Sequence, residues 1–169
     1  MSIISFIKAA GEKLFGHKEA EAAATQAKAA PDNAALQTQA AAANQAAAAA
    51  VVSYIRTQNL PADDLTVEFD GATGSVMVSG VVADQATKEI VLLCCGNVSG
   101  VEQVNELITV ESPADESQYH TVVRGDTLSA IAKTYLGNAN DYTKIFEANK
   151  PMLSSPDKIY PGQMLRIPA

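Results

Sequence analysis

A short turn that contains two glycines is the feature of the sequence best suited to hold a ligand through its backbone. It spans Gly96 to Val101, reads Gly-Asn-Val-Ser-Gly-Val, and directly follows an apolar segment with helical spacing. The last four carbonyl groups of a helix have no partner within the helix, and the helix dipole leaves about half a negative charge there. Glycines at positions 96 and 100 allow a sharply turned backbone, so several carbonyl oxygens could converge.

Two interpretations of this turn stay open at this point. Neutral carbonyl oxygens can replace the hydration shell of a weakly hydrated monovalent cation such as K⁺, whereas a dense set of carboxylates would favour divalent ions. An ordinary helix C-cap uses the same residues and binds nothing. From the turn alone, the C-cap is the preferred interpretation.

The sequence lacks the residue patterns of common catalytic and metal sites. Neither His17 nor His120 has a second histidine or a cysteine at metal-ligand spacing, and Asp63, Asp64 and Asp70 are too few to form a calcium cage. No Gly-x-Ser-x-Gly motif, phosphate-binding loop or Cys/His nucleophile pattern is present. We therefore expect a protein that is not an enzyme.

Length and charge restrict the class of protein further. The chain has 169 residues and a formal net charge of −7, which fits one ordinary domain or two small ones and argues against nucleic acid as a partner. The two cysteines, Cys94 and Cys95, are adjacent on an apolar helical face, where thiols rarely bridge and are usually inert. The absence of a disulfide framework in the sequence favours a reducing compartment.

Residues 1–16 are predicted to form an amphipathic helix. Its apolar residues fall within one arc at helical spacing: Ile3, Phe6, Ile7, Ala10 and Leu14. We expect this face to dock on the rest of the protein. The alternative is a helix lying on a membrane surface, although two lysines and one glutamate make a weak basic face.

Neither an export signal nor a membrane span is expected. The first residues carry no basic region, and Lys8 interrupts the apolar run that a secretory signal needs. No stretch of about 18 strongly apolar residues occurs. We therefore expect a cytoplasmic protein without a transmembrane segment, working as a monomer.

Residues 17–50 form an alanine-rich segment that is predicted to be helical. Between residues 20 and 50, 18 of 31 residues are alanine, the strongest helix former. Pro31 interrupts the segment, and Asp32 or Asn33 can cap a second helix that ends near Asn59, before Pro61. Alanine buries little surface, so we interpret the segment as a spacer, with a surface that binds another helix as the alternative.

Residues 51–112 have the pattern of a small mixed domain. Alternating apolar residues predict strands near 65–69, 76–80 and 104–110, with a helix over 84–95 between the second and third. Two basic and nine acidic residues give this segment a net charge of −7, equal to that of the whole chain.

After a polar linker at residues 113–118, residues 119–169 predict a second small unit of β-α-α-β order. Its predicted core consists of Val122, Leu128, Ile131, Ile145, Ile159 and Leu165. The expected fold class is therefore α+β with two small domains.

Specific motifs connect both units to known families. Residues 119–169 resemble a LysM domain in the segments Gly125-Asp-Thr-Leu128, Ala148-Asn149 and Ile159-Tyr-Pro-Gly-Gln163. Residues 51–112 resemble a BON domain in the segments Val78-Ser-Gly-Val81 and Val98-Ser-Gly-Val-Glu-Gln-Val104. The pair, together with the start Phe6-Ile-Lys-Ala-Ala-Gly-Glu-Lys-Leu14, resembles the bacterial cytoplasmic potassium-binding proteins. The alanine-rich segment is outside the resemblance and looks like an insertion.

The resemblance implies reversible binding of K⁺, with Rb⁺ and Cs⁺ as possible substitutes, and a role in ion sensing and stress response. It implies ligation by backbone carbonyls of the first helix, at Ile7, Lys8 and Ala10, and of the turn, at Gly96, Val98 and Val101. K⁺ would then join the N-terminal helix to the BON domain and act as a switch, with the LysM domain stabilising the bound form.

A second hypothesis follows from the LysM resemblance. Such domains commonly bind N-acetylglucosamine polymers such as peptidoglycan in a groove between two loops. Carried over by motif, that groove would consist of Gly125, Asp126, Thr127, Leu128, Asn149, Pro151, Ile159 and Tyr160. The structural alternative is that Asp126 or Thr127 caps the next helix and that Leu128 belongs to the core. A scaffold that binds a protein partner is a third possibility.

Overall fold

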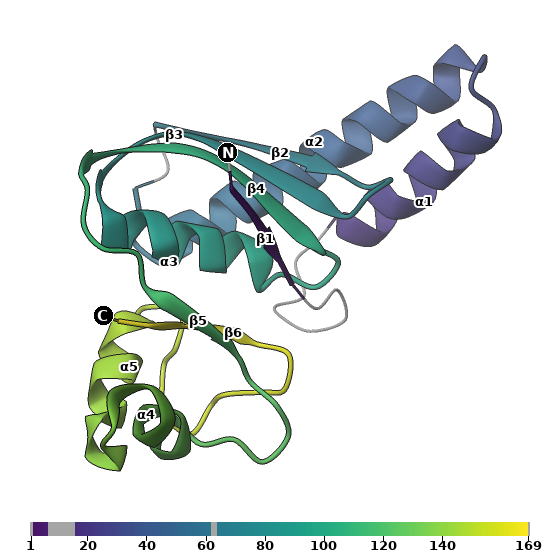
Figure 1. Ribbon diagram of the computed structural model, residues 1–169. Coiled ribbons are helices and arrows are strands. Elements are labelled where there is room, and N and C mark those ends of the chain that lie inside the picture. The colour runs from purple at the N-terminus through teal and green to yellow at the C-terminus, as the bar shows by residue number, and fades with distance from the viewer. Residues whose placement is uncertain (1, 7–15, 62–63, 169) are drawn as a thin grey trace.

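The computed structural model describes residues 2–6, 16–61 and 64–168. They form two units joined by a short connection, a larger one with a four-stranded sheet and a smaller one with a two-stranded sheet (Figure 1). The predicted α+β class is confirmed.

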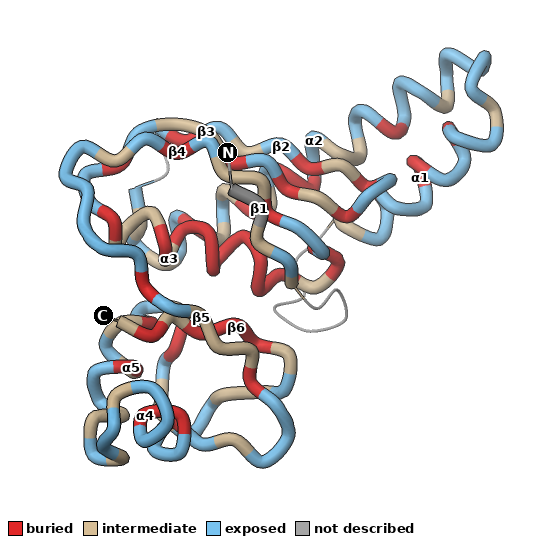
Figure 2. Tube along the Cα trace, in the orientation of Figure 1, coloured by how far each residue is buried: buried red, intermediate tan, exposed pale blue. Residues whose placement is uncertain are grey.

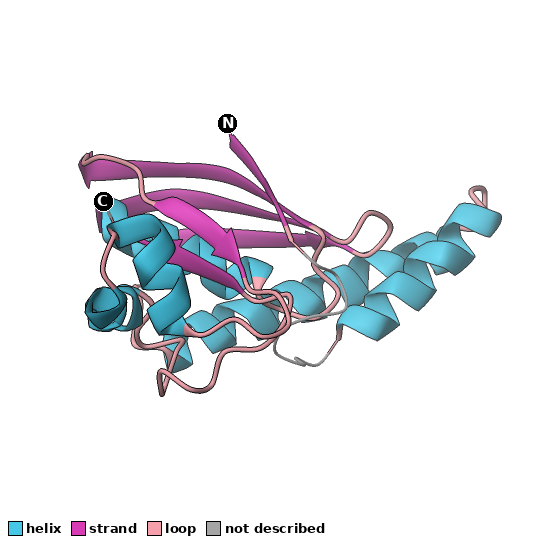
Figure 3. Ribbon diagram, turned by 60° about the horizontal axis from the view of Figure 1, so that its bottom comes forward, coloured by secondary structure: helices cyan, strands magenta, loops and turns pink. Residues whose placement is uncertain are grey.

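The larger unit is a sheet with helices on one face (Figure 3). Strands β2 (Leu65–Asp70) and β3 (Ser75–Asp84) form an antiparallel hairpin. Helix α3 (Gln85–Gly96) then crosses over to β4 (Gln103–Ser112), which pairs with β3 in parallel. The sheet order is β1-β4-β3-β2. This arrangement places the turn after α3 at the edge where β4 begins.

Alternation along the strands builds the core between the sheet and α3. Val76, Val78 and Val104 are fully buried on the face that the helices cover, and α3 adds Val91 and Cys94. Figure 2 shows α3 as the most continuously buried helix of the chain. It is enclosed because it lies between the sheet and the smaller unit.

The first residues form a strand instead of the predicted helix. β1 (Ser2–Ser5) pairs antiparallel with β4, and the Phe6 N–H continues the pairing by donating to the Glu102 carbonyl at 2.8 Å. The helix prediction is wrong for residues 2–5, because the open edge of β4 offers hydrogen bonds to a segment with two β-branched isoleucines at its centre. Residues 7–15, the rest of that predicted helix, lie outside the described residues.

Helices α1 (His17–Ala29) and α2 (Ala34–Thr57) form an antiparallel hairpin that projects from the sheet (Figure 1). The Asn33 side chain accepts hydrogen bonds from Ala35 N–H at 3.1 Å and Leu36 N–H at 3.3 Å, so the predicted cap is confirmed. The second half of α2 buries Val51 and Ile55 against the sheet. The alanine-rich stretch therefore continues without a break into a helix of the larger unit.

The smaller unit has the predicted β-α-α-β order. It contains β5 (Gln118–Thr121), α4 (Leu128–Leu136), a 3₁₀ turn η1 (Ala139–Asp141), α5 (Tyr142–Ala148) and β6 (Met164–Ile167), with β5 and β6 antiparallel. Five of its six predicted core residues are buried, and Ile159 packs at the edge of that core.

Candidate functional site

The turn after α3 has a conformation that bends the backbone back on itself. The Asn97 N–H donates to the Leu93 carbonyl at 2.9 Å and ends the helix, and the Val101 N–H donates to the Val98 carbonyl at 3.1 Å. Gly100 has φ +100, a conformation that side chains with a Cβ rarely adopt. Each carbonyl oxygen has two lone pairs, so a carbonyl that accepts one hydrogen bond can still face a cation.

The turn is fixed by its apolar side chains. Val98 and Val101 are 2% and 0% exposed and belong to the core between sheet and helices. Gly96 and Gly100 are also buried. These side chains therefore set the shape of the backbone, and the main-chain oxygens are the polar groups that these four residues offer.

The β2–β3 turn packs against the turn after α3. The Gly74 carbonyl accepts the Glu102 N–H at 2.7 Å, and a Cβ added at Gly74 would lie 3.0 Å from the Gly100 carbonyl oxygen. Glu102 also accepts the Phe6 N–H through its own carbonyl. Glu102, which directly follows the turn after α3, is thus hydrogen-bonded to both the N-terminal strand and the β2–β3 turn.

Two aromatic rings cover the glycines of the turn. A Cβ added at Gly96 would collide with the ring of Phe6, and one added at Gly100 would lie 2.6 Å from the His17 ring. Phe6 and His17 lie on either side of the stretch 7–15. The described residues on both sides of that stretch therefore contact the turn.

The structure brings together one half of the predicted ligand set. Gly96, Val98 and Val101 share this single buried turn. Ile7, Lys8 and Ala10 lie outside the described residues. Within residues 2–6, 16–61 and 64–168, no group of three or more His, Cys, Asp or Glu side chains is placed to hold a metal ion.

The adjacent cysteines lie on the inner side of α3, as predicted. Both are 0% exposed. Burial raises the pKa of Cys94 to about 12, and burial together with the neighbouring Cys94 raises the pKa of Cys95 further. The thiols are protonated core groups and not nucleophiles.

The same turn also contacts the smaller unit through Asn97, which the sequence analysis did not single out. Asn97 is 3% exposed; its Nδ2 donates to the Met164 carbonyl at 2.8 Å, and its Oδ1 accepts the Met164 N–H at 2.8 Å. Its polarity within an apolar turn is the sequence signal that could have identified it. That signal could not predict the partner of Asn97, because Met164 lies 67 residues further along the chain.

A second bridge between the units is built around Glu89 of α3, which is 1% exposed. Its carboxylate accepts hydrogen bonds from Arg166 Nε at 2.5 Å, the Ser117 N–H at 2.9 Å and Gln85 Nε2 at 2.9 Å. Burial alone would raise the pKa of Glu89, but these hydrogen bonds together outweigh it and lower the pKa.

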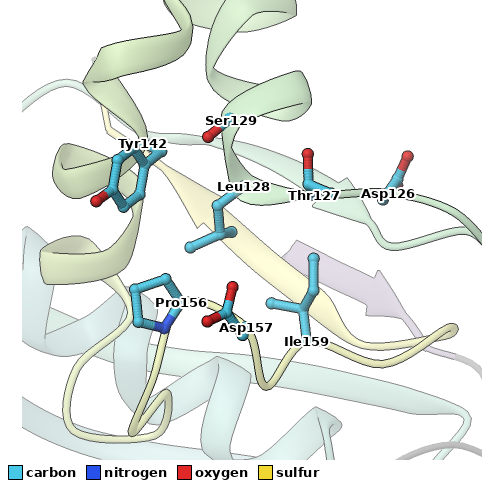
Figure 4. Close-up of a pocket in the computed structure, with 8 residues that line it drawn as sticks. All are labelled: Asp126, Thr127, Leu128, Ser129, Tyr142, Pro156, Asp157 and Ile159. Carbon is cyan, nitrogen blue, oxygen red and sulfur yellow. The ribbon is translucent and has the colours of Figure 1, made fainter.

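The residues predicted to bind a glycan separate into two groups. Asp126, Thr127, Leu128 and Ile159 line one pocket of about 450 Å³ in the smaller unit, with Ser129, Tyr142, Pro156 and Asp157. In Figure 4, Leu128 and Ile159 point toward each other across this pocket, while Asp126 and Thr127 point away from Ile159. Gly125, Asn149, Pro151 and Tyr160 are not among its lining residues.

Several of these residues have structural roles. Thr127 caps α4 by accepting the Ala130 N–H, and Leu128 is 2% exposed in the core. Asn149, fully buried, exchanges hydrogen bonds with the main chain of Arg166. Asp126 accepts hydrogen bonds from the Val123 N–H and His120, which lower its pKa.

The two units correspond to two known domain families. Residues 43–112 match the BON domain and residues 120–168 match the LysM domain, so the molecule is a BON–LysM protein and the presence of both domains is confirmed. The BON match begins eight residues before the predicted boundary at residue 51. No helix in the described part of the chain is long and apolar enough to cross a membrane.

Comparison of the whole chain identifies the family. It is 41% identical over 169 residues to the potassium binding protein Kbp of Escherichia coli O6:H1, with 99% of each chain covered. It is 32% identical over 132 residues to an uncharacterized protein of Deinococcus radiodurans, where the match covers 72% of this chain and 51% of that protein. The chain belongs to the BON–LysM family that includes Kbp.

Proposed function

We propose that this protein binds K⁺ reversibly, through backbone carbonyls of Gly96, Val98 and Val101 together with those of Ile7, Lys8 and Ala10. The observation that carries the proposal is the contact of Phe6 with Gly96 and of His17 with Gly100, on either side of residues 7–15. The name of the relative that is 41% identical, a potassium binding protein, supports the same ion.

The chemistry of the turn favours a large monovalent cation. Its oxygens are neutral carbonyls at the negative end of α3, and the described residues provide no carboxylate cage. Rb⁺ and Cs⁺ are the ions that would substitute for K⁺, because they are also large and weakly hydrated. The net charge of −7 on residues 51–112 attracts cations without selecting among them.

K⁺ would act as a switch on the N-terminal segment. An ion held by oxygens from two parts of the chain binds the docked state and not the undocked one, so it shifts the equilibrium toward docking. β1 would position the segment on the edge of β4, and the ion would hold the residues that follow Phe6. We propose a non-catalytic role in the cytoplasm, with the LysM domain stabilising the bound form.

Titration with K⁺ and with Na⁺ at constant ionic strength tests this proposal. Isothermal titration calorimetry and the melting temperature should respond to K⁺ and Rb⁺ far more than to Na⁺. Equal responses to K⁺ and Na⁺ would refute the selectivity, and the absence of any response would refute the site.

A matched pair of variants locates the site. Phe6→Ala removes the ring that covers Gly96 and should weaken K⁺ binding. Val123→Ala truncates a smaller apolar side chain at a position that is 59% exposed in the LysM domain, and should bind K⁺ like the unmodified protein. Equal affinities in both variants would argue against the turn as the site.

Binding of an N-acetylglucosamine polymer is the second candidate function, and the pocket between Leu128 and Ile159 favours it. A pull-down on peptidoglycan tests it, with Ile159→Asp as the variant that should abolish retention. Retention by the unmodified protein, together with its recovery from outside the cytoplasm, would make glycan binding the main role.

A further inference from the structure

Asn97 connects the proposed cation turn to the LysM domain with both ends of its side-chain amide. The amide nitrogen donates to the carbonyl of Met164, and the amide oxygen accepts from the N–H of the same residue, each at 2.8 Å. This reciprocal pair has the pattern of one hydrogen-bonded rung between antiparallel strands. Met164 is the first residue of β6, so Asn97 extends the LysM sheet toward α3.

The contact between Asn97 and Met164 affects the carbonyl groups that are proposed to bind K⁺. Asn97 stands between Gly96 and Val98, two of the residues whose carbonyls are proposed to bind the ion. The orientation of the Gly96 carbonyl relative to the Val98 carbonyl therefore depends on the backbone dihedral angles of Asn97 together with those of Val98. Because both polar atoms of the side chain are engaged and Asn97 is 3% exposed, the LysM main chain restricts the dihedral angles of Asn97.

The Glu89 bridge joins the same two domains at a different place. It lies eight residues before Asn97 on α3, about 12 Å along the helix axis. Its partners are the Arg166 side chain and the Ser117 N–H, and neither belongs to the turn. The protein therefore contains one domain contact at the turn and another away from it.

We propose that Asn97 is a positioning residue through which the LysM domain holds the turn in its ion-binding conformation. This inference rests on the proposed function of the turn as a K⁺ site. By linkage, K⁺ binding strengthens the contact between Asn97 and Met164 to the same extent as that contact strengthens K⁺ binding. The LysM domain orients the ion site through the main-chain groups of Met164, and this role requires no glycan.

The test compares the full chain with Asn97→Ala and, as matched control, Glu89→Gln. Both variants remove hydrogen bonds between the domains, but only Asn97→Ala changes the turn. Calorimetry should show K⁺ affinity falling by a factor of about 5–150 in Asn97→Ala, the range typical of such coupling. In Glu89→Gln the affinity should change by less than about 3-fold. Asn97→Ser, a neutral replacement whose shorter side chain cannot form the paired hydrogen bonds of the amide and adds no charge beside the turn, serves if Asn97→Ala does not fold.

Hydrogen exchange at the Met164 amide supplies a readout that needs no variant. Its N–H donates to Asn97, so K⁺ should slow its exchange in the unmodified protein, while Na⁺ should not. Unmodified protein that binds no K⁺ would refute the proposed function and this inference with it. K⁺ binding with equal affinity in all variants, or with no change in Met164 exchange, would refute the role of Asn97 alone.

Discussion

Replacing Gly100 by alanine should destabilise the BON domain and weaken K⁺ binding together. At φ +100 a residue with a Cβ is strained, at a cost of about 1–3 kcal/mol. The new Cβ would also lie 2.6 Å from the His17 ring, and such overpacking costs about 1–3 kcal/mol more. The expected loss is therefore about 2–6 kcal/mol in the free energy of unfolding, measured by urea denaturation followed by circular dichroism.

Gly125→Ala separates the two contributions to that loss. Gly125 has φ +95, but a Cβ there would meet nothing within 4 Å. This variant should lose only the backbone contribution, about 1–3 kcal/mol, and should bind K⁺ normally. If the two variants lose the same stability, the contact with His17 contributes nothing. If Gly100→Ala binds K⁺ as tightly as the unmodified protein, the turn is not the site.

Three further predictions concern the cap, the domain interface and the thiols. Asn33→Ala should lower the free energy of unfolding by about 1 kcal/mol in the same assay, because two N–H groups at the start of α2 lose their acceptor. The pKa of Glu89 is lower in the folded protein than its ordinary value of 4.5, so its stabilising effect is complete above about pH 5 and is lost as the pH falls through the lowered pKa. Below about pH 5, the free energy of unfolding of Glu89→Gln should therefore depend less on pH than that of the unmodified protein. Identical dependence on pH in the two proteins would contradict this account. Cys94 and Cys95 should resist alkylation by iodoacetamide at pH 8 until urea unfolds the BON domain, and rapid labelling of the native protein would contradict their burial.

The elements that depend on local signals could be predicted from the sequence. Asp32 and Asn33 after Pro31 were the two cap candidates that placed the start of α2, and the pattern of the LysM domain predicted its strands and helices. Apolar spacing also placed Cys94 and Cys95 on the inner side of α3. In each case the interactions that decide the structure lie within a few residues, or within a pattern that the family repeats.

The features that the sequence did not predict depend on distant partners. Ser2–Ser5 has apolar spacing compatible with a helix, and only the free edge of β4, about 100 residues later, makes it a strand. From the sequence alone, Asn97 is one residue of a turn, and Glu89 is one polar residue of a predicted helix. Their roles come from Met164 and Arg166, which lie 67 and 77 residues away.

The alanine-rich hairpin is more closely tied to the candidate site than a spacer would be. Its first turn packs so tightly on the β2–β3 turn that a Cβ added at Gly71 would lie 2.5 Å from the Ala20 carbonyl. Asn44 of α2 accepts the Gly71 N–H at 3.0 Å, and Ala20 is 0% exposed. These contacts fix the position of His17, one turn earlier, over Gly100. Small side chains at the base of the hairpin are therefore needed for the close approach that holds His17 against the turn. Further along the hairpin, Ala23, Ala27 and Ala40 are buried between the two helices, so small side chains are needed there as well.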